Sequence, residues 1–495
     1  MDGWVEQELA TLDLQDERRN RRLKRVVADL AARPAMSIPA AVGGGHAETA
    51  AAYRLFDNPA MEFESVLAPH REATLARVQA QAVVVVAQDT TEIDLTRPHE
   101  PPRGAGPLDA GPRRGCFLHP LLAVTPERVP LGTVWTRCWA RDEPPPERLS
   151  PAARKRRRAR TPIEDKESQR WIDGLRAAHE IAALAPQTEV ISVADSEADI
   201  FELLLAGQAE AAAENHPRAQ WILRAGHDRA VRPEEKGAVP RDGTESAEKH
   251  VFAAVAATSV LTTAEITIRG RDPQAWSDRS RRRQPRTPRQ AVVEIRARRV
   301  TLRAPSRPDR RLNDVTVQAV LVREVAPPAG EDAVTWLLLT SLPIETVAQV
   351  QRVIEFYCLR WVIELFFRVL KQGCRVEARR FECLDRWTRY LSVAMIVAWR
   401  TLYVTYLGRG WPDRDCEVVF TPAEWKSVYQ VTQRRPPPEK PPSLQEMVRL
   451  VAQLGGYVNR KRKDEPGAET VWKGLQRLHD ITLCWETFGP EARSG

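Results

Sequence analysis

The sequence lacks the residue patterns of several common classes of site. Its seven cysteines are an odd number without a C-x-x-C pair, so neither a disulfide framework nor a zinc knuckle is predicted. Its nine histidines include no H-x-x-x-H pair, so a metal site that depends on histidine is not indicated. This cysteine usage favours a reducing compartment, and we expect a cytoplasmic, nucleoid-associated protein.

Long apolar segments are also missing. The first residues, MDGWVEQELATLDLQDERR, are acidic and then basic and contain no apolar signal core. No run of about 18 apolar residues is present, so no membrane-spanning segment is expected. No internal repeat is evident. Together these absences leave a globular protein of 495 residues, long enough for several domains and a large core.

Basic residues are in modest excess and unevenly distributed. The formal net charge is +8, with 43% hydrophobic and 28% charged residues. One cluster lies early, at Arg18, Arg19, Arg21, Arg22, Lys24 and Arg25, and two others lie at 154–158 and 281–283. Such clusters favour a polyanionic partner, with nucleic acid first. The two later blocks lie among Pro and Ser and are better explained as solvated loops.

Residues 1 to about 75 show helical spacing of apolar residues. Leu23, Val26, Val27 and Leu30 repeat at that spacing, so Arg18, Arg19, Arg22 and Arg25 can line one exposed face. A second helix, through Ala50–Phe56, carries Arg54 and stops at Asp57–Asn58–Pro59. A small helical unit with a basic face favours a DNA-docking module, although a merely solvated helical bundle fits equally well at this point.

Two acidic residues follow apolar runs that are typical of buried strands. Asp89 comes just after Val83–Ala87, and Asp195 just after Glu189–Ala194. Open α/β sheets commonly place their chemistry at such strand ends. Further strands are predicted at Trp221–Arg224 and Thr335–Thr340, and the runs Phe117–Thr125 and Pro130–Trp139 predict a hairpin.

The remaining segments complete a predicted α/β architecture. A loop is expected from Pro144 to Pro162, and a β-rich insertion at about 230–335, where short β-branched runs alternate with polar turns. From about residue 386 the pattern becomes helical again. We therefore predict a helical N-terminal domain (1–75), a catalytic core (76–385) and a helical C-terminal domain (386–495).

The segment Tyr357–Lys371 is predicted to form one long helix with a polar stripe. At about 100° per residue, Tyr357, Arg360, Glu364 and Lys371 fall within an arc of roughly 60° on an otherwise apolar helix. One interpretation is a solvated ion-pair stripe, since Arg360 and Glu364 are spaced i,i+4. The other interpretation is that Glu364 binds a metal ion while Tyr357, Arg360 and Lys371 bind phosphates.

Three acids thus occupy distinctive places: Asp89, Asp195 and Glu364. Each alone is weak evidence, but together they could form an oxygen-rich site for Mg²⁺, which prefers carboxylate ligands. Two such ions bridged by a carboxylate suit in-line attack on a phosphodiester.

The sequence resembles bacterial insertion-sequence transposases of the DDE class, specifically the IS-four family with its Tyr-Arg-Glu-Lys signature. That signature, Y-x2-R-x3-E-x6-K, is met by Tyr357, Arg360, Glu364 and Lys371. Further matches extend the resemblance over nearly the whole chain, at Asp89–Thr91, Asp195–Asp199, Trp336–Thr340, Leu14–Leu23, Ala52–Asn58, Leu454–Arg460 and Pro466–Leu475.

This resemblance implies a ribonuclease H-like α/β core with a β-rich insertion, flanked by a helical DNA-end-binding domain and a helical dimerisation domain. It implies that Asp89, Asp195 and Glu364 bind two Mg²⁺ ions and that Mn²⁺ can substitute for them. It further implies DNA contacts by Tyr357, Arg360, Lys371 and Arg224, stacking of a flipped base on Trp336, and contacts of the N-terminal arginines Arg18, Arg19, Arg22 and Arg54 with the terminal repeats. The expected partners are double-stranded DNA, as terminal inverted repeats and target, and a second copy of the chain in a synaptic homodimer.

One residue departs from the family pattern, and two other functions compete. Ser196 stands where the family usually has Arg, which removes a cation beside the predicted metal site. The expected activity is cut-and-paste transposition through end cleavage, a DNA hairpin and strand transfer. The alternatives are a catalytically silent DNA-end-binding regulator of transposition and a nuclease with another substrate on the same core.

Overall fold

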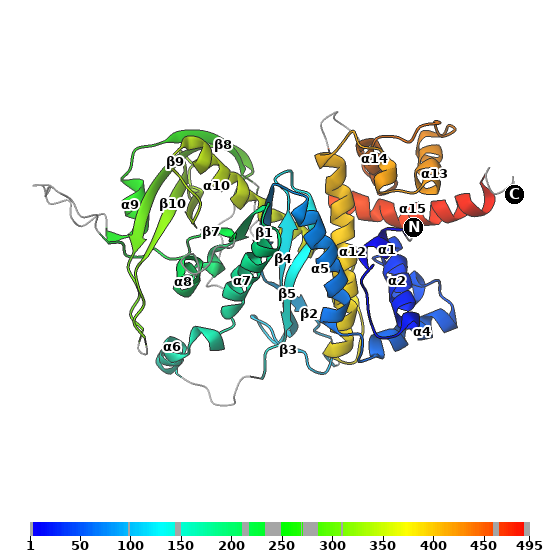
Figure 1. Cartoon of the computed structure of the whole chain (residues 1–495), viewed down its shortest axis with the longest axis horizontal. Helices are drawn as coiled ribbons and strands as arrows, with labels where there is room; N and C mark the ends of the chain where they lie inside the picture. Colours follow the sequence, from blue (N-terminus) through cyan, green and yellow to red (C-terminus); the bar gives the residue numbers. More distant parts are fainter. Residues whose placement is uncertain are drawn as a thin grey trace, which may run out of the picture. The chain divides into compact units, whose positions relative to one another are not determined.

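The computed structural model describes residues 3–97, 100–143, 150–209, 217–232, 249–268, 270, 286–307, 310–458 and 465–489 (Figure 1). The chain divides into two compact units. Unit 1 comprises Met1–Glu143 and Trp361–Gly495, and unit 2 comprises Pro144–Arg360. The domain boundaries expected near residues 75 and 385 do not coincide with this division and stay predictions. The basic block 281–283 lies outside the described residues.

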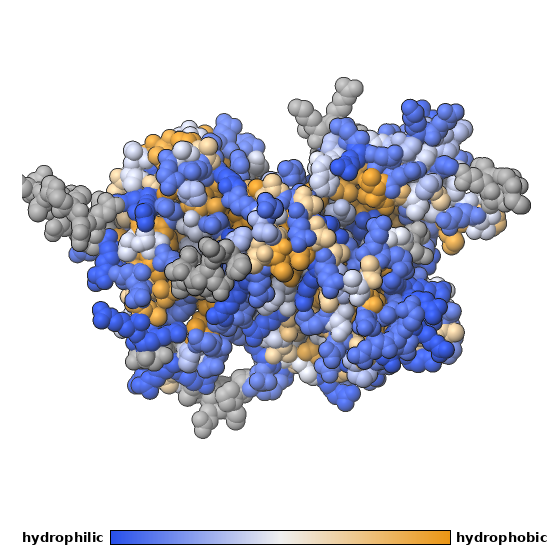
Figure 2. Space-filling model, viewed as in Figure 1, coloured by the Kyte–Doolittle hydropathy of each residue, from blue (hydrophilic) through white to orange (hydrophobic). Residues whose placement is uncertain are grey.

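Five helices form the N-terminal part of unit 1: α1 (Gly3–Glu8), α2 (Glu17–Ala32), α3 (Ile38–Ala41), α4 (His46–Asp57) and α5 (Phe63–Gln79). The Asp16 carboxylate caps α2 by accepting a hydrogen bond from the Arg18 backbone N–H at 2.8 Å. The apolar residues of α2 are buried, as their spacing predicts. Helices α2 and α4 pack together, and hydrophilic residues dominate the surface over them (Figure 2).

The strands of unit 1 are β1 (Val83–Gln88), β2 (Thr91–Asp94), β3 (Gly106–Pro107), β4 (Arg114–Val124) and β5 (Pro130–Trp139). Strand β4 pairs antiparallel with each of the other four. The β4–β5 pairing confirms the predicted hairpin. Because β1 is buried along almost its whole length, its end at Gln88 is held firmly, and the next residue is Asp89.

The second half of unit 1 contains α11 (Trp361–Arg368), a π-helical turn (Val369–Gly373), a short 3₁₀ turn (Val376–Ala378), α12 (Leu384–Gly410), a second 3₁₀ turn (Cys416–Val418), α13 (Pro422–Gln433), α14 (Leu444–Leu454) and α15 (Ala468–Phe488). The single long helix predicted over Tyr357–Lys371 is therefore wrong in detail. Helix α10 (Val347–Leu359) ends before Arg360, and Lys371 lies in the π turn, which rotates it away from ideal α-helical spacing.

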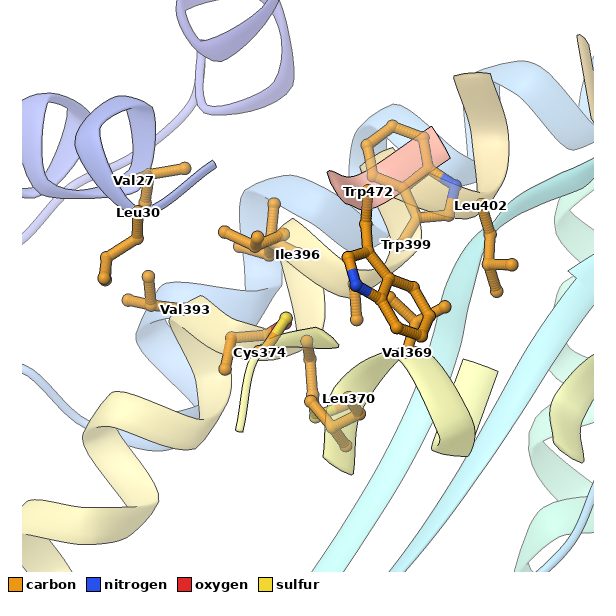
Figure 3. Close-up of a cluster of buried hydrophobic side chains, with 14 of the residues drawn as sticks. Val27, Leu30, Val369, Leu370, Cys374, Val393, Ile396, Trp399, Leu402 and Trp472 are labelled. Carbon is orange, nitrogen blue, oxygen red and sulfur yellow. The ribbon is translucent and has the colours of Figure 1, made fainter. Parts of the chain in front are cut away.

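Helix α12 is the centre of the unit 1 core. Val393 and Ile396 on α12 lie near Val27 and Leu30 of α2, and Trp399 lies near Trp472 of α15 (Figure 3). Cys374 and Leu370, at the π turn, approach the same helix. By length and composition α12 could cross a membrane, but 89% of its most apolar window is buried in the protein. Such burial is that of a core helix, which is apolar on all sides because protein surrounds it.

Unit 2 begins with α6 (Pro151–Arg160), the 3₁₀ turn Ile163–Asp165 and α7 (Gln169–Leu184). The prediction of a loop from Pro144 to Pro162 is therefore wrong for Pro151–Arg160. Ser150 caps this helix by accepting from the Ala153 N–H at 3.2 Å, and Pro151 suits a first helical turn because that position needs no N–H donor.

The strands of unit 2 are β6 (Glu189–Ala194), β7 (Gln220–Arg224), β8 (Thr262–Ile268), β9 (Arg289–Leu302), β10 (Val315–Glu324) and β11 (Thr335–Thr340). Strands β6 and β7 are parallel, and β11, β10, β9 and β8 follow in antiparallel order. Helix α9 (Val251–Ala256) lies on β9 and β10, and α8 (Phe201–Ala209) contacts β10 (Figure 1). The expected α/β fold, with a mixed sheet and helical regions near both ends of the chain, is confirmed.

A buried polar network ties α1 to α5 and β5 in unit 1. The Glu8 carboxylate accepts hydrogen bonds from His70 Nδ1 at 2.5 Å and from Arg77 Nη1 and Nη2 at 2.8 and 2.9 Å. The Thr133 backbone N–H donates to His70 Nε2 at 3.0 Å, so that nitrogen must be an acceptor and the imidazole is neutral. Burial lowers the pKa of His70, and Glu8 only partly opposes this effect.

This network makes the stability of unit 1 dependent on pH. A depressed histidine pKa contributes stability above the ordinary value of 6.5, and that stability is lost as the pH falls below it. We expect chemical unfolding midpoints of the wild type to fall between pH 7 and pH 5, at a cost of at most about 1.4 kcal/mol per pH unit. His70→Gln should flatten this dependence, whereas parallel profiles for the two proteins would contradict the assignment.

Candidate active site

Asp89 lies where strand β1 ends in unit 1. Its Oδ1 accepts a hydrogen bond from the Thr90 backbone N–H at 2.8 Å. The Thr90 hydroxyl contacts His119 Nδ1 at 2.8 Å, and His119 Nε2 lies 3.3 Å from Gln88 Oε1. His119 is fully buried on β4. The residues on either side of Asp89 are therefore anchored to the neighbouring strand, which positions the carboxylate.

Glu364 lies on α11, also in unit 1. The apolar residues Val362, Ile363, Phe366 and Phe367 of α11 are buried, and the helix contacts β1. The packing thus joins the helix that carries Glu364 to the strand that ends at Asp89. Both carboxylates are partly exposed.

Lys371, the last residue of the signature, has an intramolecular partner. Its Nζ lies 3.5 Å from Glu377 Oε1, and that oxygen also accepts from the Asp94 backbone N–H at 3.0 Å. Lys371 is partly exposed in the π turn, so its ion pair with Glu377 contributes little free energy. A more highly charged anion can therefore replace Glu377 as its partner.

Asp195 lies at the end of β6 in unit 2, and the strand register explains its neighbours. Because Ala194 pairs with Leu223 in the parallel β6–β7 ladder, the next residues, Asp195 and Arg224, come at the same end of the sheet. Asp195 Oδ1 accepts from the Glu197 backbone N–H at 2.8 Å, which caps the following 3₁₀ turn. Ser196 is exposed in that turn.

Four further predicted residues gather around Asp195 in unit 2. Arg224 pairs with Leu338 of β11, and its Nη2 donates to the Thr335 carbonyl at 3.3 Å. The rings of Trp336 and Tyr357 lie 5.9 Å apart between centroids. Burial raises the pKa of the Tyr357 phenol; the guanidinium groups of Arg360 and Arg224 oppose this rise, and the Asp195 carboxylate adds to it. Unit 2 therefore assembles one carboxylate, two guanidinium groups and two aromatic rings.

Sequence reasoning missed two residues that support this cluster. Asp199 is buried and accepts hydrogen bonds from the Gly226 and His227 backbone N–H groups, both at 2.8 Å. It also accepts from Arg229 Nε and Nη2 at 3.0 and 2.6 Å. Asp199 stands in the quoted second-acid motif, so that motif held a signal for it, but nothing in the sequence pointed to Arg229.

The donor set is chemically suited to a hard cation. Asp89, Asp195 and Glu364 offer only carboxylate oxygens, which Mg²⁺ prefers. Within the described residues of either unit, no group of three His, Cys, Asp or Glu side chains forms a metal site by itself. Asp89 and Glu364 lie in unit 1, and Asp195 lies in unit 2.

The predicted terminal-repeat contacts all lie on α2 and α4. Arg18 and Arg54 are exposed, and Arg22 is partly exposed. Arg19 is held more tightly, because its Nη1 donates to the Leu14 carbonyl at 3.1 Å and its Nε lies 3.8 Å from Asp16 Oδ2. Since α2 and α4 contact each other, their arginines can form one basic surface.

Comparison with known proteins finds three transposase domains along the chain. The family model "Transposase DNA-binding" matches residues 1–61, "Transposase DDE domain" matches 213–399, and "Transposase Tn5 dimerisation domain" matches 396–485. The DDE match includes Arg224, Trp336 and the whole Tyr-Arg-Glu-Lys signature, whereas Asp89 and Asp195 lie before it.

A solved structure also aligns with this chain over much of the length of both proteins. A piggyBac transposase synaptic complex with hairpin DNA matches at 9% sequence identity and a TM-score of 0.34, covering 82% of this chain and 72% of that one. The domain matches support a DNA-binding protein that forms dimers. Matches to three transposase domains, in the order DNA-binding, DDE and dimerisation, support the assignment of this chain as a DDE transposase.

Proposed function

We propose that the protein is a Mg²⁺-dependent cut-and-paste transposase of the IS-four group that cleaves and joins the ends of its own insertion sequence. The observation that carries this proposal is the unit 2 cluster of Asp195, Arg224, Trp336, Tyr357 and Arg360. Structural ion pairing alone does not account for a single carboxylate beside two guanidinium groups and two neighbouring, tilted aromatic rings at the end of a parallel strand pair. That combination suits a phosphodiester and an unstacked base.

Each residue has a proposed part in the reaction. Asp89, Asp195 and Glu364 would hold the two metal ions, which when bound activate the attacking water or 3′-hydroxyl and stabilise the leaving oxygen. Arg360 and Arg224 would hold the phosphate in line for attack, since guanidinium groups match phosphate oxygens in a two-pronged geometry. Lys371 would exchange Glu377 for a phosphate.

Trp336 has a role specific to a hairpin intermediate. A tight hairpin strains the stacked bases near its tip, and a base that rotates out loses stacking energy. The indole of Trp336, which lies beside the Tyr357 ring, offers a flat surface that restores part of this energy, about 1–3 kcal/mol per base.

The proposed assembly is a homodimer on paired DNA ends in the cytoplasm, associated with the nucleoid. The exposed arginines of α2 and α4 would read the terminal inverted repeats, with Arg22 and Arg54 as the central contacts and Arg18 beside them. Arg19 would contribute mainly by fixing the start of α2.

The decisive experiment uses DNA carrying the inverted repeats that flank the gene. Purified full-length protein should nick and then excise this DNA with Mg²⁺ or Mn²⁺, produce hairpin ends on denaturing gels, and lose all cleavage on chelation while still shifting the DNA. Stable binding with no cleavage in either metal would instead identify a silent regulator. Equal cleavage of random DNA would identify a nuclease with another substrate.

A further inference from the structure

A cavity of about 480 Å³ opens within unit 1, away from the proposed catalytic residues. Its walls come from α1 and α2, from Arg77 of α5, and from α12, α13, α15 and the 3₁₀ turn before α13. This volume lies in the range of pockets that bind small molecules in proteins, about 300–1,000 Å³. None of the residues proposed for phosphodiester cleavage lines it, and its lining from Trp399 to His479 falls within the match to the dimerisation domain.

Arg400, on α12, presents its charge to this cavity. Its Nη2 donates to the Val419 carbonyl at 3.1 Å, and its Cζ lies 5.1 Å from the Trp4 ring centroid and 5.9 Å from that of Tyr403. Among the described residues no carboxylate lies within ion-pair distance of this guanidinium. Burial lowers the pKa of Arg400 to about 10, with only partial opposition from Tyr403, Glu424 and Glu8.

The acidic residues that line the cavity are engaged elsewhere. Glu8 is bound by His70 and both terminal nitrogens of Arg77. Glu424 accepts from the Thr421 backbone N–H at 2.8 Å in the capping box of α13. Glu417 accepts from Trp425 Nε1 at 2.9 Å. Arg400 therefore has no ion-pair partner among the described residues, and Glu8 and Glu424 only partly offset the burial of its charge, so an anionic ligand would stabilise it further.

The rest of the lining is suited to an apolar body. Ala28, Ala31, Val404, Phe420 and Leu478 contribute side chains without hydrogen-bonding groups. A ligand that fills the cavity would cover these residues while its anionic end meets Arg400. The guanidinium fork prefers oxyanions with two oxygens at the same spacing, such as carboxylate and phosphate.

We propose that this cavity is a binding site for a small organic anion, with an apolar body that ends in one carboxylate or phosphate group held by Arg400. The size of the site limits the ligand to a single small molecule. The cavity walls join α1 and α2 to the C-terminal helices, so bound ligand would stabilise the contact between these two parts of unit 1.

The test is calorimetric titration of the full-length protein with benzoate, phenyl phosphate, benzamide and inorganic phosphate. Benzoate and phenyl phosphate should bind, and benzamide, the neutral analogue of benzoate, should bind at least tenfold more weakly. Inorganic phosphate, which lacks the apolar body, should also bind at least tenfold more weakly than phenyl phosphate. Equal affinity for benzoate and benzamide, or for the two phosphates, would overturn the proposal.

Variants separate ligand binding from folding. Arg400→Met should weaken benzoate binding at least tenfold without lowering the thermal midpoint of the free protein, because it removes a desolvated charge. Arg386→Met is the matched control on the same helix: Arg386 pairs with Asp57 outside the cavity, and its loss should leave affinity unchanged. Ala31→Leu narrows the cavity and keeps Arg400. It should weaken the binding of both benzoate and phenyl phosphate. Unchanged affinity in Arg400→Met and Ala31→Leu would exclude this cavity as the site.

Discussion

Replacing Asp89 by Asn should abolish cleavage of end-containing DNA while leaving DNA binding intact. The substitution keeps the size of the side chain and the oxygen that accepts from Thr90 N–H, but it removes the charge that a metal ion requires. Substituting a residue that contacts only a metal ligand lowers activity by about 10–100-fold. Substituting a residue that binds the metal itself should therefore lower the cleavage rate by more than about a hundred-fold. Single-turnover cleavage and gel-shift assays on the same DNA measure the two effects separately.

Glu92→Gln is the matched control for this substitution. Glu92 is a nearby carboxylate on β2 that pairs with Arg113 Nη2 at 2.6 Å, and it has no proposed metal role. Its cleavage rate should stay within a few-fold of the wild type, since partly exposed ion pairs contribute about 1 kcal/mol or less. Cleavage by Asp89→Asn at the rate of Glu92→Gln would refute the metal-ligand assignment.

A cysteine at the same position tests the metal directly. Asp89→Cys replaces a hard oxygen ligand by a softer thiolate, which Mn²⁺ tolerates better than Mg²⁺. Partial recovery of cleavage in Mn²⁺ but not in Mg²⁺ would show that residue 89 touches the ion.

Replacing Asp199 by Ala should destabilise unit 2 more than any other change in the second-acid motif. It leaves the Arg229 guanidinium and the Gly226 and His227 N–H groups without their buried acceptor. Removing one partner of a buried ion pair costs about 3–5 kcal/mol. For a unit of this size the thermal midpoint should fall by on the order of 10 °C. Differential scanning calorimetry measures the change.

Glu197, two residues earlier, provides the control for Asp199. Its carboxylate is largely exposed and pairs with Arg170 at 3.2 Å, so Glu197→Gln should alter stability by less than about 1 kcal/mol. Because Asp199 anchors the segment after β7, its loss should also displace Arg224 and reduce cleavage. Equal midpoints for the two variants would mean that Asp199 does not hold this segment.

Local sequence patterns were sufficient for most of the elements that carry the site. The runs before Asp89 and Asp195 are short, continuous and apolar, and such a run predicts a buried strand. The same holds for β11, which carries Trp336. The hairpin of β4 and β5 followed from two apolar runs joined by a short turn.

The helix that carries the signature residues shows where local patterns fail. Helical spacing placed Lys371 on one stripe with Tyr357, but α10 ends at Leu359 and a π turn follows Arg368. This turn is in contact with a distant segment: α15 packs on it, and an added Cβ at Gly373 would lie 3.3 Å from the Trp472 ring. Trp472 is about a hundred residues away in the chain, so no local pattern contains that contact.

The supporting residues of the site also depend on distant partners. His119 reaches Thr90 only because β4 pairs with β1, and Arg229 reaches Asp199 across the segment after β7. Their distances along the chain, 29 and 30 residues, hide both contacts from local patterns.

The sequence by itself therefore predicted which acids, cations and rings form the site, and it determined the strands that end at Asp89 and Asp195 and the strand that carries Trp336, because these depend on short-range periodicity. The tertiary structure alone decided how Asp195, Arg224, Trp336, Tyr357 and Arg360 meet, how the π turn redirects Lys371, and that Arg400 faces a cavity. Those outcomes depend on contacts between segments far apart in the chain, which form only when the core packs.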